Sequence, residues 1–303
     1  MTTRAGFVAL IGEPNAGKST LTNRMVGAKV SIVTHKVQTT RARIRGIALE
    51  GEAQIVFVDT PGLVRPRRRL DRAMVAAAWG GAADADIVVL LIEAHRGLTD
   101  GVKAILDALE ARTNPRQKVA LAINKIDKVK AEALLKLTQD MNAAYPFVKT
   151  FLISAERGHG AQDLKAWLGA ELPEGPWLYP EDQIADLPMR MIAAEMTREK
   201  CTLRLHQELP YELTVETENW EERDDGSVRI DQVIFVARDG HKGIVLGHKG
   251  ETVKAIGQQA RAEITEFLGR KVHLFLTVRV RANWLDEAER YGEMGLDFRD
   301  GNA

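Results

Sequence analysis

The sequence of 303 residues contains one cysteine, Cys201, and no apolar run of 18 or more residues. A single cysteine excludes an internal disulfide and leaves too few thiolates for a cysteine-based zinc site. We expect Cys201 to be packed as a small hydrophobic side chain. The absence of a long apolar run argues against a transmembrane helix, and the N-terminal MTTRAGFVALIG lacks the length and cleavage site of a signal peptide. We therefore expect a cytoplasmic protein.

The sequence also lacks net charge, because 42 Lys and Arg residues balance 42 Asp and Glu residues. This balance is uneven along the chain. Residues 1–180 carry 25 basic and 18 acidic side chains, whereas residues 181–303 carry 17 basic and 24 acidic ones. Any contact with nucleic acid must therefore be sought in local patches rather than in the overall charge.

Short runs rich in Val, Ile and Leu alternate with amphipathic stretches through residues 5–172. This pattern predicts a doubly wound α/β sheet of about six mostly parallel strands that are buried on both faces. Residues 41–51 alternate with a period of two, which predicts an antiparallel edge strand. The other predicted strands are 7–11, 54–58, 86–92, 118–123 and 150–153, and the predicted helices are 18–27, 100–111, 130–144 and 161–171.

Residues 173–188 contain four prolines and show no periodicity, which is typical of a linker. The length of the chain also favours two domains. We expect a first domain over residues 1–173, a linker over 174–188 and a smaller α+β domain over 189–303. The predicted elements of the second domain are a helix at 189–204, strands at 210–219 and 228–237, helices near 241–246 and at 251–268, and a strand at 271–281.

The segment GEPNAGKS, residues 12–19, matches the phosphate-loop pattern G-x-x-x-x-G-K-[ST] between a predicted strand and a predicted helix. Glycines let backbone N–H groups face a phosphate, and the start of the helix adds partial positive charge. Lys18 is suited to the β- and γ-phosphates, and Ser19 is suited to Mg²⁺. The motif predicts a nucleoside triphosphate site but does not distinguish ATP from GTP. The alternative is a glycine-rich turn that ends in Lys-Ser by chance.

Asn124-Lys125-Ile126-Asp127 follows another predicted strand and resembles the guanine-specificity motif N-K-x-D of regulatory GTPases. Asp127 can accept hydrogen bonds from guanine N1–H and N2–H₂, a donor pair that adenine lacks. Lys125 can lie along the base, and Asn124 can tie this loop to the phosphate loop. Ser154-Ala155 resembles the fifth GTPase motif, whose backbone contacts the guanine carbonyl. For N-K-x-D, the alternative is an ordinary polar turn.

Asp59-Thr60-Pro61-Gly62 follows a third predicted strand. In such a D-x-x-G motif, Asp59 would hold Mg²⁺ through water and the Gly62 N–H would sense the γ-phosphate. Thr39 and Thr40 precede the edge strand and are candidates for closing over Mg²⁺, and the sequence leaves open which one does so.

The three motifs together predict a GTP or GDP site with Mg²⁺. The predicted nucleotide-binding residues are Gly12, Glu13, Pro14, Asn15, Ala16, Gly17, Lys18, Ser19, Thr20, Asp59, Thr60, Pro61, Gly62, Leu63, Asn124, Lys125, Ile126, Asp127, Ser154 and Ala155. The predicted Mg²⁺ ligands are Ser19, Thr39, Thr40 and Asp59, and the residues expected to act in hydrolysis are Lys18, Thr39, Thr40 and Gly62.

Leu63 stands where many small GTPases have a glutamine that orients the attacking water. We therefore expect slow intrinsic GTP hydrolysis and a role as a timed switch. Asn15 resembles the phosphate-loop asparagine that helps some GTPases with this replacement to bind potassium, so a K⁺ site is a further hypothesis.

A basic run follows the D-x-x-G motif and consists of Arg65, Arg67, Arg68, Arg69 and Arg72. A solvated charged surface is its simplest interpretation. The alternatives are contact with RNA phosphates and a role for one arginine near the transition state.

Gly247-His248-Lys249-Gly250 lies between two predicted helices and resembles the G-x-x-G loop of a KH domain. The predicted order of helix, strand, strand, helix, G-x-x-G, helix and strand is that of the type II form. Residues 238–281 carry nine Lys and Arg against four Asp and Glu, which favours an RNA-binding face. The alternative is a plain turn between helices. The predicted RNA-binding residues are Lys242, Gly243, Gly247, His248, Lys249, Gly250, Lys254 and Arg261.

Apolar spacing in this region predicts which side chains form the core of the second domain. The predicted core residues are Ile244, Val245, Leu246, Ile256 and Ile264. We expect His241 and His248 to be polar loop residues rather than metal ligands, because no partners lie at a suitable spacing.

A GTPase followed by a type II KH domain resembles the Era family of bacterial GTPases over essentially the whole chain. The matching segments are GEPNAGKST, KVQTTRARIRGI, DTPGL, NKID, SA and VLGHKGETVKAIGQQAR. The resemblance implies a cytoplasmic protein that binds the 3′ region of small-subunit ribosomal RNA, assists maturation of the small ribosomal subunit and associates peripherally with the inner face of the cell membrane. We expect a monomer. The departures from the family are Ala16, where valine is common, and the heavier arginine run, and neither affects a ligand role.

Two other classes of function stay open. One is a GTPase that acts on proteins or membranes and uses the KH-like domain only as a scaffold. The other is an RNA-binding protein with a degenerate, non-hydrolytic nucleotide site. The intact Lys18, Ser19, Asp59 and Asp127 argue against the second class.

Overall fold

The computed structural model describes residues 2–34, 36, 39–41, 44–63, 66, 68–112, 117–282, 284, 287–294 and 296–299. These residues form two compact units. The first unit comprises described residues of Met1–Ser31, Thr40–Asp186 and Tyr291–Ala303, and the second comprises those of Ile32–Thr39 and Leu187–Arg290. No helix in the described part of the chain combines the length and apolar character needed to span a membrane.

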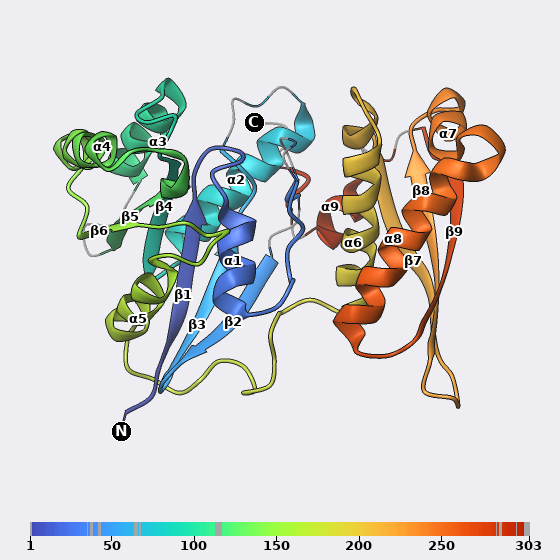
Figure 1. Ribbon diagram of the computed structural model, residues 1–303, viewed down its shortest axis with the longest axis horizontal. Coiled ribbons are helices and arrows are strands. Elements are labelled where there is room, and N and C mark those ends of the chain that lie inside the picture. Colours follow the sequence, from blue (N-terminus) through green and yellow to red (C-terminus); the bar gives the residue numbers. More distant parts are fainter. Residues whose placement is uncertain are drawn as a thin grey trace. The chain divides into compact units, whose positions relative to one another are not determined.

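The first unit is built on a six-stranded sheet in the order β2-β3-β1-β4-β5-β6 (Figure 1). The pair of β2 and β3 is antiparallel, and every other neighbouring pair is parallel. The predicted doubly wound, mostly parallel α/β sheet is thus confirmed. The strands are β1 (Arg4–Ile11), β2 (Ile44–Glu50), β3 (Ala53–Asp59), β4 (Ile87–Glu93), β5 (Lys118–Asn124) and β6 (Lys149–Leu152).

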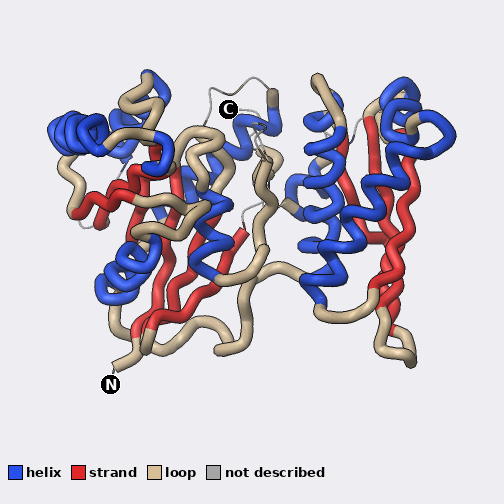
Figure 2. Tube along the Cα trace, in the orientation of Figure 1, coloured by secondary structure: helices blue, strands red, loops and turns tan. Residues whose placement is uncertain are grey.

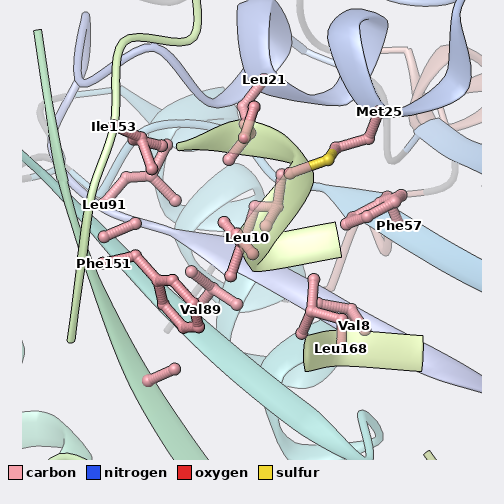
Figure 3. Packing of buried hydrophobic residues seen from close by; sticks show 14 of the residues in the cluster. Val8, Leu10, Leu21, Met25, Phe57, Val89, Leu91, Phe151, Ile153 and Leu168 are labelled. Atoms are coloured by element: carbon pink, nitrogen blue, oxygen red, sulfur yellow. The ribbon is translucent and has the colours of Figure 1, made fainter. Parts of the chain in front are cut away.

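Helices cover both faces of this sheet, because its central strands are apolar on both sides. Every residue of β3 and β4 is buried, as expected for parallel strands between two helical layers. The first hydrophobic cluster packs α1 (Lys18–Val26) and α5 (Ala161–Glu171) against one face, and Figure 3 shows Leu21 and Met25 pointing toward Leu10 and Leu168 beside Val8. The second cluster packs α2 (Arg69–Ala83), α3 (Asp100–Arg112) and α4 (Ala131–Ala144) against the other face.

This topology determines where the predicted motifs lie. The strand β1 pairs in parallel with β3 on one side and with β4 on the other, and β4 pairs in parallel with β5. The carboxyl ends of β1, β3 and β5 therefore lie at the same edge of the sheet. The phosphate loop, the D-x-x-G segment and the N-K-x-D segment each begin at one of these ends. Loops at the carboxyl edge of such a sheet are the usual place for a ligand site.

The helix α2 has no counterpart among the predicted elements. Its sequence RLDRAMVAAAWGGAA contains many alanines and two glycines, so the apolar periodicity that marks a helix is weak. Arg69 and Arg72 of the basic run belong to this helix, and Arg68 is its N-cap. Arg65 and Arg67 lie outside the described residues.

The proline-rich segment is attached to the first unit by hydrogen bonds. The side-chain carbonyl of Gln54 accepts the N–H groups of Leu178 and Tyr179 at 2.8 and 2.9 Å, and the Ile47 N–H donates to the Ile184 carbonyl at 2.9 Å. The segment therefore runs along the first unit. Its predicted role as a linker over residues 174–188 stays a prediction.

The second unit contains a three-stranded sheet in the order β7-β8-β9. The pair of β7 and β8 is antiparallel, and the pair of β8 and β9 is parallel. Figure 2 shows the long helices α6 and α8 side by side along one face of this sheet. The elements are α6 (Met189–Arg204), η2 (Leu209–Tyr211), β7 (Leu213–Glu222), β8 (Val228–Val236), α7 (Asp239–Leu246), η3 (His248–Gly250), α8 (Glu251–Leu268) and β9 (Val272–Val280), followed by α9 (Ala288–Glu293). This order confirms the predicted type II KH fold.

Two predictions for the second unit are wrong. Ile244 was predicted to be a core residue, yet it is 58% exposed, because Val245 next to it takes the inward position on α7. His241 was predicted to be a polar loop residue, yet it is buried in α7, four residues before Val245 and on the same face of the helix. Its Nε2 accepts a hydrogen bond from Arg238 Nε at 2.7 Å. Val245, Ile256 and Ile264 are buried as predicted, and Leu246 is partly buried.

The burial of Cys201 predicts that its thiol is unreactive. The side chain is fully buried in α6, and burial raises the pKa of this thiol to about 12. The thiolate is the reactive species, so we expect Ellman's reagent at pH 8 to label the folded protein at least about 100-fold more slowly than the guanidinium-unfolded protein. Labelling of the folded protein at the rate of an exposed cysteine would contradict the packing of α6.

Candidate functional site

The phosphate-loop lysine is buried at the start of α1. Lys18 follows Gly17, whose φ of 99° and close approach to the side-chain amide of Asn124 leave no room for a Cβ atom. The Lys18 ammonium donates hydrogen bonds to the carbonyls of Gly12 and Glu13, both at 3.1 Å. Burial lowers the pKa of Lys18 to about 8, although the carboxylates of Asp59 and Glu13 oppose this shift. An anion bound at this loop would favour the charged form of Lys18.

Asp59 ends β3 beside the phosphate loop and is fully buried. Burial raises its pKa, whereas hydrogen bonds from Ser31 and Ser19 and the charge of Lys18 act in the opposite direction. The Ser31 hydroxyl donates to Oδ2 at 2.7 Å. Among the described residues, no group forms a hydrogen bond with Oδ1. A buried carboxylate oxygen without a partner is what a hydrated cation would satisfy.

The structure separates the two candidate threonines. The Thr40 hydroxyl lies 2.8 Å from the Ser19 hydroxyl, whereas the Thr39 hydroxyl lies 2.6 Å from that of Thr34 and donates to the Lys36 carbonyl at 2.7 Å. Ser19, Thr40 and Asp59 thus provide oxygen atoms of the kind that Mg²⁺ prefers. No group of three His, Cys, Asp or Glu side chains that could hold a metal occurs among the described residues. The donors therefore fit a magnesium ion that also binds a phosphate, rather than a zinc site.

The D-x-x-G segment packs directly on the phosphate loop. The Leu63 N–H donates to the Gly12 carbonyl at 3.0 Å, and a Cβ atom on Gly62 would lie 2.9 Å from the Cα of Pro14. The Thr60 hydroxyl donates to the Leu10 carbonyl at 2.7 Å, so its side chain faces the sheet. The Leu63 side chain is buried and carries no polar atom with which to orient water.

Asn124 connects three loops at the end of β5. Its side-chain amide donates to the Ala16 carbonyl at 2.8 Å, and its Oδ1 accepts the N–H groups of Lys125 and Ala155 at 2.8 and 2.9 Å. The contact predicted between the Ala155 backbone and guanine would share this N–H group. Ile126 begins the short helix η1 (Ile126–Lys128).

Neighbouring groups lower the pKa of Asp127. A hydrogen bond from the Ser154 hydroxyl lowers the pKa of Asp127, with a smaller contribution from the nearby Arg157, whose Nε lies 3.5 Å from Oδ2. A carboxylate that is only an acceptor suits the two donors on the Watson–Crick edge of guanine.

The G-x-x-G loop joins α7 to α8, and three of its four residues have a positive φ. Gly247, Lys249 and Gly250 all have positive φ values, 73°, 49° and 81°. Gly250 is the N-cap of α8, so the first N–H groups of that helix face the loop. Lys242, Lys249, Lys254 and Arg261 form no ion pair within the described part of the chain, and Lys254 and Arg261 are exposed on one face of α8.

Some residues that contact the site belong to none of the predicted motifs. Ser31 binds Asp59, and its backbone is held in turn by the Asn23 side chain, whose Oδ1 accepts the N–H groups of Val30 and Ser31 at 2.9 Å. Glu93 ends β4, where it accepts a hydrogen bond from Lys125 Nζ at 2.6 Å. Glu93 is far from the N-K-x-D motif in sequence, and only the adjacency of β4 and β5 could have indicated it.

Two family models match the chain, one in each unit. The model described as 50S ribosome-binding GTPase matches residues 7–125, and the model described as KH domain matches residues 208–285.

The full length of the chain is similar to several named proteins. It is 82% identical to GTPase Era of Dinoroseobacter shibae over 99% of this chain and 98% of the relative, and 63% identical to GTPase Era of Brucella suis over 98% and 94%. Among solved structures, Aquifex aeolicus Era bound to GDP and aluminium fluoride has a TM-score of 0.90 at 36% identity, covering 97% of this chain and 99% of that one. Era in complex with MgGDPNP and nucleotides 1506–1542 of 16S ribosomal RNA has a TM-score of 0.89, with the same identity and coverage.

The geometry of Asp127 predicts that one substitution changes the preferred base. Asparagine presents one acceptor and one donor, which match the N1–H and C2 carbonyl of xanthine but not the two donors of guanine. We expect Asp127→Asn to weaken GDP binding about 100-fold and to strengthen binding of xanthosine diphosphate by a similar factor, measured by fluorescent-nucleotide titration. The same change at the exposed Asp140 on α4 is the control. An unchanged preference for GDP would place the base elsewhere.

Proposed function

The chain belongs to the Era family of GTPases, and we propose that it is a GTP-hydrolysing switch that binds the 3′ region of small-subunit ribosomal RNA and assists assembly of the small ribosomal subunit. The observation that carries this proposal is the presence of both required sites in one chain. The first unit presents a phosphate loop and a carboxylate suited to guanine, and the second presents a G-x-x-G loop flanked by cations that form no ion pair with any described residue. The relative solved with MgGDPNP and 16S ribosomal RNA supports the same pairing of ligands.

In the nucleotide site, each group has a role that follows from its position. The buried Lys18 ammonium would hold the β- and γ-phosphates, and the Gly62 N–H would detect the γ-phosphate. Mg²⁺, when bound, would neutralise phosphate charge; Ser19 and Thr40 would hold it directly and Asp59 through water. We assign this role to Thr40 rather than Thr39 because only Thr40 reaches Ser19.

Hydrolysis in this site would be slow. Leu63 has no polar group to orient the attacking water. Backbone groups would have to position this water, and catalysis would depend mainly on stabilising the charge of the phosphates. Asn15 lies in the phosphate loop with a φ of 65°, and its carbonyl already accepts Lys125 Nζ at 2.6 Å. Its side chain is the proposed contact for a K⁺ ion, and equal hydrolysis rates in sodium and potassium buffers would contradict that role.

The RNA site would combine backbone contacts with local positive charge. The G-x-x-G backbone allows close approach of a single strand, and the unpaired cations Lys242, Lys249, Lys254 and Arg261 would contact its phosphates. Ile244, which is exposed three residues before Gly247, would offer an apolar surface to an unstacked base. The remaining predicted RNA contacts, Gly243 and His248, are exposed beside these groups.

Segment Ile32–Thr39, which belongs to the second unit, provides a route by which nucleotide could influence RNA binding. There the Val33 N–H donates to Glu199 Oε1 of α6 at 2.8 Å, and Arg198 donates to the Thr39 carbonyl. The next residue, Thr40, belongs to the first unit and reaches Ser19. A change at Thr40 on GTP binding would therefore be transmitted along the chain to α6, so that nucleotide and RNA bias the same equilibrium.

The remaining assignments follow the family. We propose a cytoplasmic monomer with peripheral association with the inner face of the cell membrane. We also propose a GTPase domain over residues 1–173 and a KH domain over 189–303, with residues 174–188 between them.

Gly250 offers a clean test of RNA binding. A Cβ atom at Gly250 would meet nothing within 4 Å, whereas one at Gly247 would collide with Thr252. Asp and Asn both tolerate the left-handed backbone of this N-cap position and differ only in charge. We expect Gly250→Asp to weaken binding of a single-stranded RNA from the 3′ end of small-subunit ribosomal RNA at least about tenfold more than Gly250→Asn does, measured by fluorescence anisotropy at fixed salt.

The control is GDP affinity, which both variants should retain because Gly250 lies in the other unit. Equal RNA binding by the wild type, Gly250→Asp and Gly250→Asn would favour a KH-like scaffold that acts on proteins or membranes.

A further inference from the structure

Glu93 is a carboxylate at the edge of the nucleotide site that belongs to none of the GTPase motifs. It is the last residue of β4, it pairs in register with Asn124 of β5, and its side chain is only 8% exposed. A carboxylate is rarely buried to this extent without a charged partner. Charged groups next to Glu93 should therefore compensate for the burial of its carboxylate.

Three basic side chains face Glu93, and the nearest is the lysine of the N-K-x-D motif, since His95 Nε2 and Arg96 NH1 each lie 3.5 Å from the carboxylate. Lys125 Nζ lies 2.6 Å from Glu93 Oε2 and also donates to the Asn15 carbonyl of the phosphate loop at 2.6 Å. Lys125 itself has a left-handed backbone, with φ of 63° and ψ of 36°. Its ammonium is thus fixed by one acceptor from β4 and another from the phosphate loop.

A second carboxylate extends this connection. Arg96 NH1 lies 3.5 Å from Glu93 Oε1 and 3.7 Å from Glu13 Oε2, and the Thr99 hydroxyl donates to Glu13 Oε2 at 2.9 Å. Glu13 is a phosphate-loop residue whose carbonyl accepts a hydrogen bond from Lys18. The end of β4 therefore contacts the N-K-x-D motif through Glu93, and the loop after β4 contacts Glu13 of the phosphate loop through Arg96 and Thr99.

We propose that Glu93 is a positioning residue of the guanine site, which fixes the Lys125 ammonium so that the alkyl stem of Lys125 is held in place for the base. The inference rests on the proposed function, because it assumes that Lys125 lies along guanine. Glu93 belongs neither to the phosphate loop nor to the N-K-x-D motif. It acts on nucleotide affinity through Lys125, and through Lys125 on the Asn15 carbonyl.

A double-mutant cycle separates this role from a purely structural one. The substitutions are Glu93→Gln, which keeps the shape of the side chain and removes its charge, and Lys125→Met, which keeps the stem and removes the ammonium. We expect Glu93→Gln to weaken binding of fluorescent GDP about tenfold in the wild-type background and less than about twofold in the Lys125→Met background. A loss of the same size in both backgrounds would overturn the proposal.

Two further variants keep the experiment decisive. Glu93→Asp retains the charge on a shorter side chain and should lose less affinity than Glu93→Gln, which gives a readout even if the glutamine variant folds poorly. Glu110→Gln makes the same chemical change on the exposed face of α3 and should leave GDP affinity unchanged. If Glu93→Asp binds as weakly as Glu93→Gln, charge does not matter and the proposal fails.

The base itself gives an independent readout. Lys125 would act on the face of the ring, so Glu93→Gln should weaken GDP and inosine diphosphate by the same factor, whereas loss of Asp127 should affect GDP more. A larger effect of Glu93→Gln on GDP than on inosine diphosphate would overturn the proposed route through Lys125. Failure of the wild-type protein to bind any guanine nucleotide would instead overturn the proposed function.

Discussion

Two opposite charges buried at one edge of the first sheet are the constraint on which the nucleotide site depends. The strand order places β1 beside β3, so Lys18 at the start of α1 and Asp59 at the end of β3 lie at the same carboxyl edge of the sheet. Burial lowers the pKa of Lys18 to about 8 and raises that of Asp59, which means that water no longer stabilises either charge. In the proposed function, a triphosphate with Mg²⁺ would supply the missing charge and oxygen ligands.

The sequence was sufficient to predict the fold class and the motifs because both are local patterns. Continuous apolar runs indicate parallel strands. In GEPNAGKS and in G-x-x-G, a few adjacent residues determine the backbone geometry of the loop. The order of elements in the second unit follows from the same reasoning. Helix α2 escaped prediction because alanine contributes little to an apolar period, and Ile244 was misplaced because adjacent apolar residues on one short helix cannot both face the sheet.

Contacts between distant segments could not be predicted in this way. Three hydrogen bonds depend on which strands are neighbours and on how the loops turn at their ends. They join Ser31 to Asp59, Thr40 rather than Thr39 to Ser19, and Glu93 to Lys125. The contacts of segment Ile32–Thr39 with α6 are of the same kind. These unpredicted contacts join residues of the motifs to groups outside them.

The central claim is that guanine nucleotide and RNA bias one equilibrium, and linkage tests it directly. The affinities of GDP and of a non-hydrolysable GTP analogue should be measured with and without saturating single-stranded RNA from the 3′ end of small-subunit ribosomal RNA. The account predicts that RNA changes the ratio of the two nucleotide affinities by about tenfold, and that the analogue changes RNA affinity relative to GDP by the same factor. A ratio that RNA leaves unchanged would show two independent sites and contradict the account.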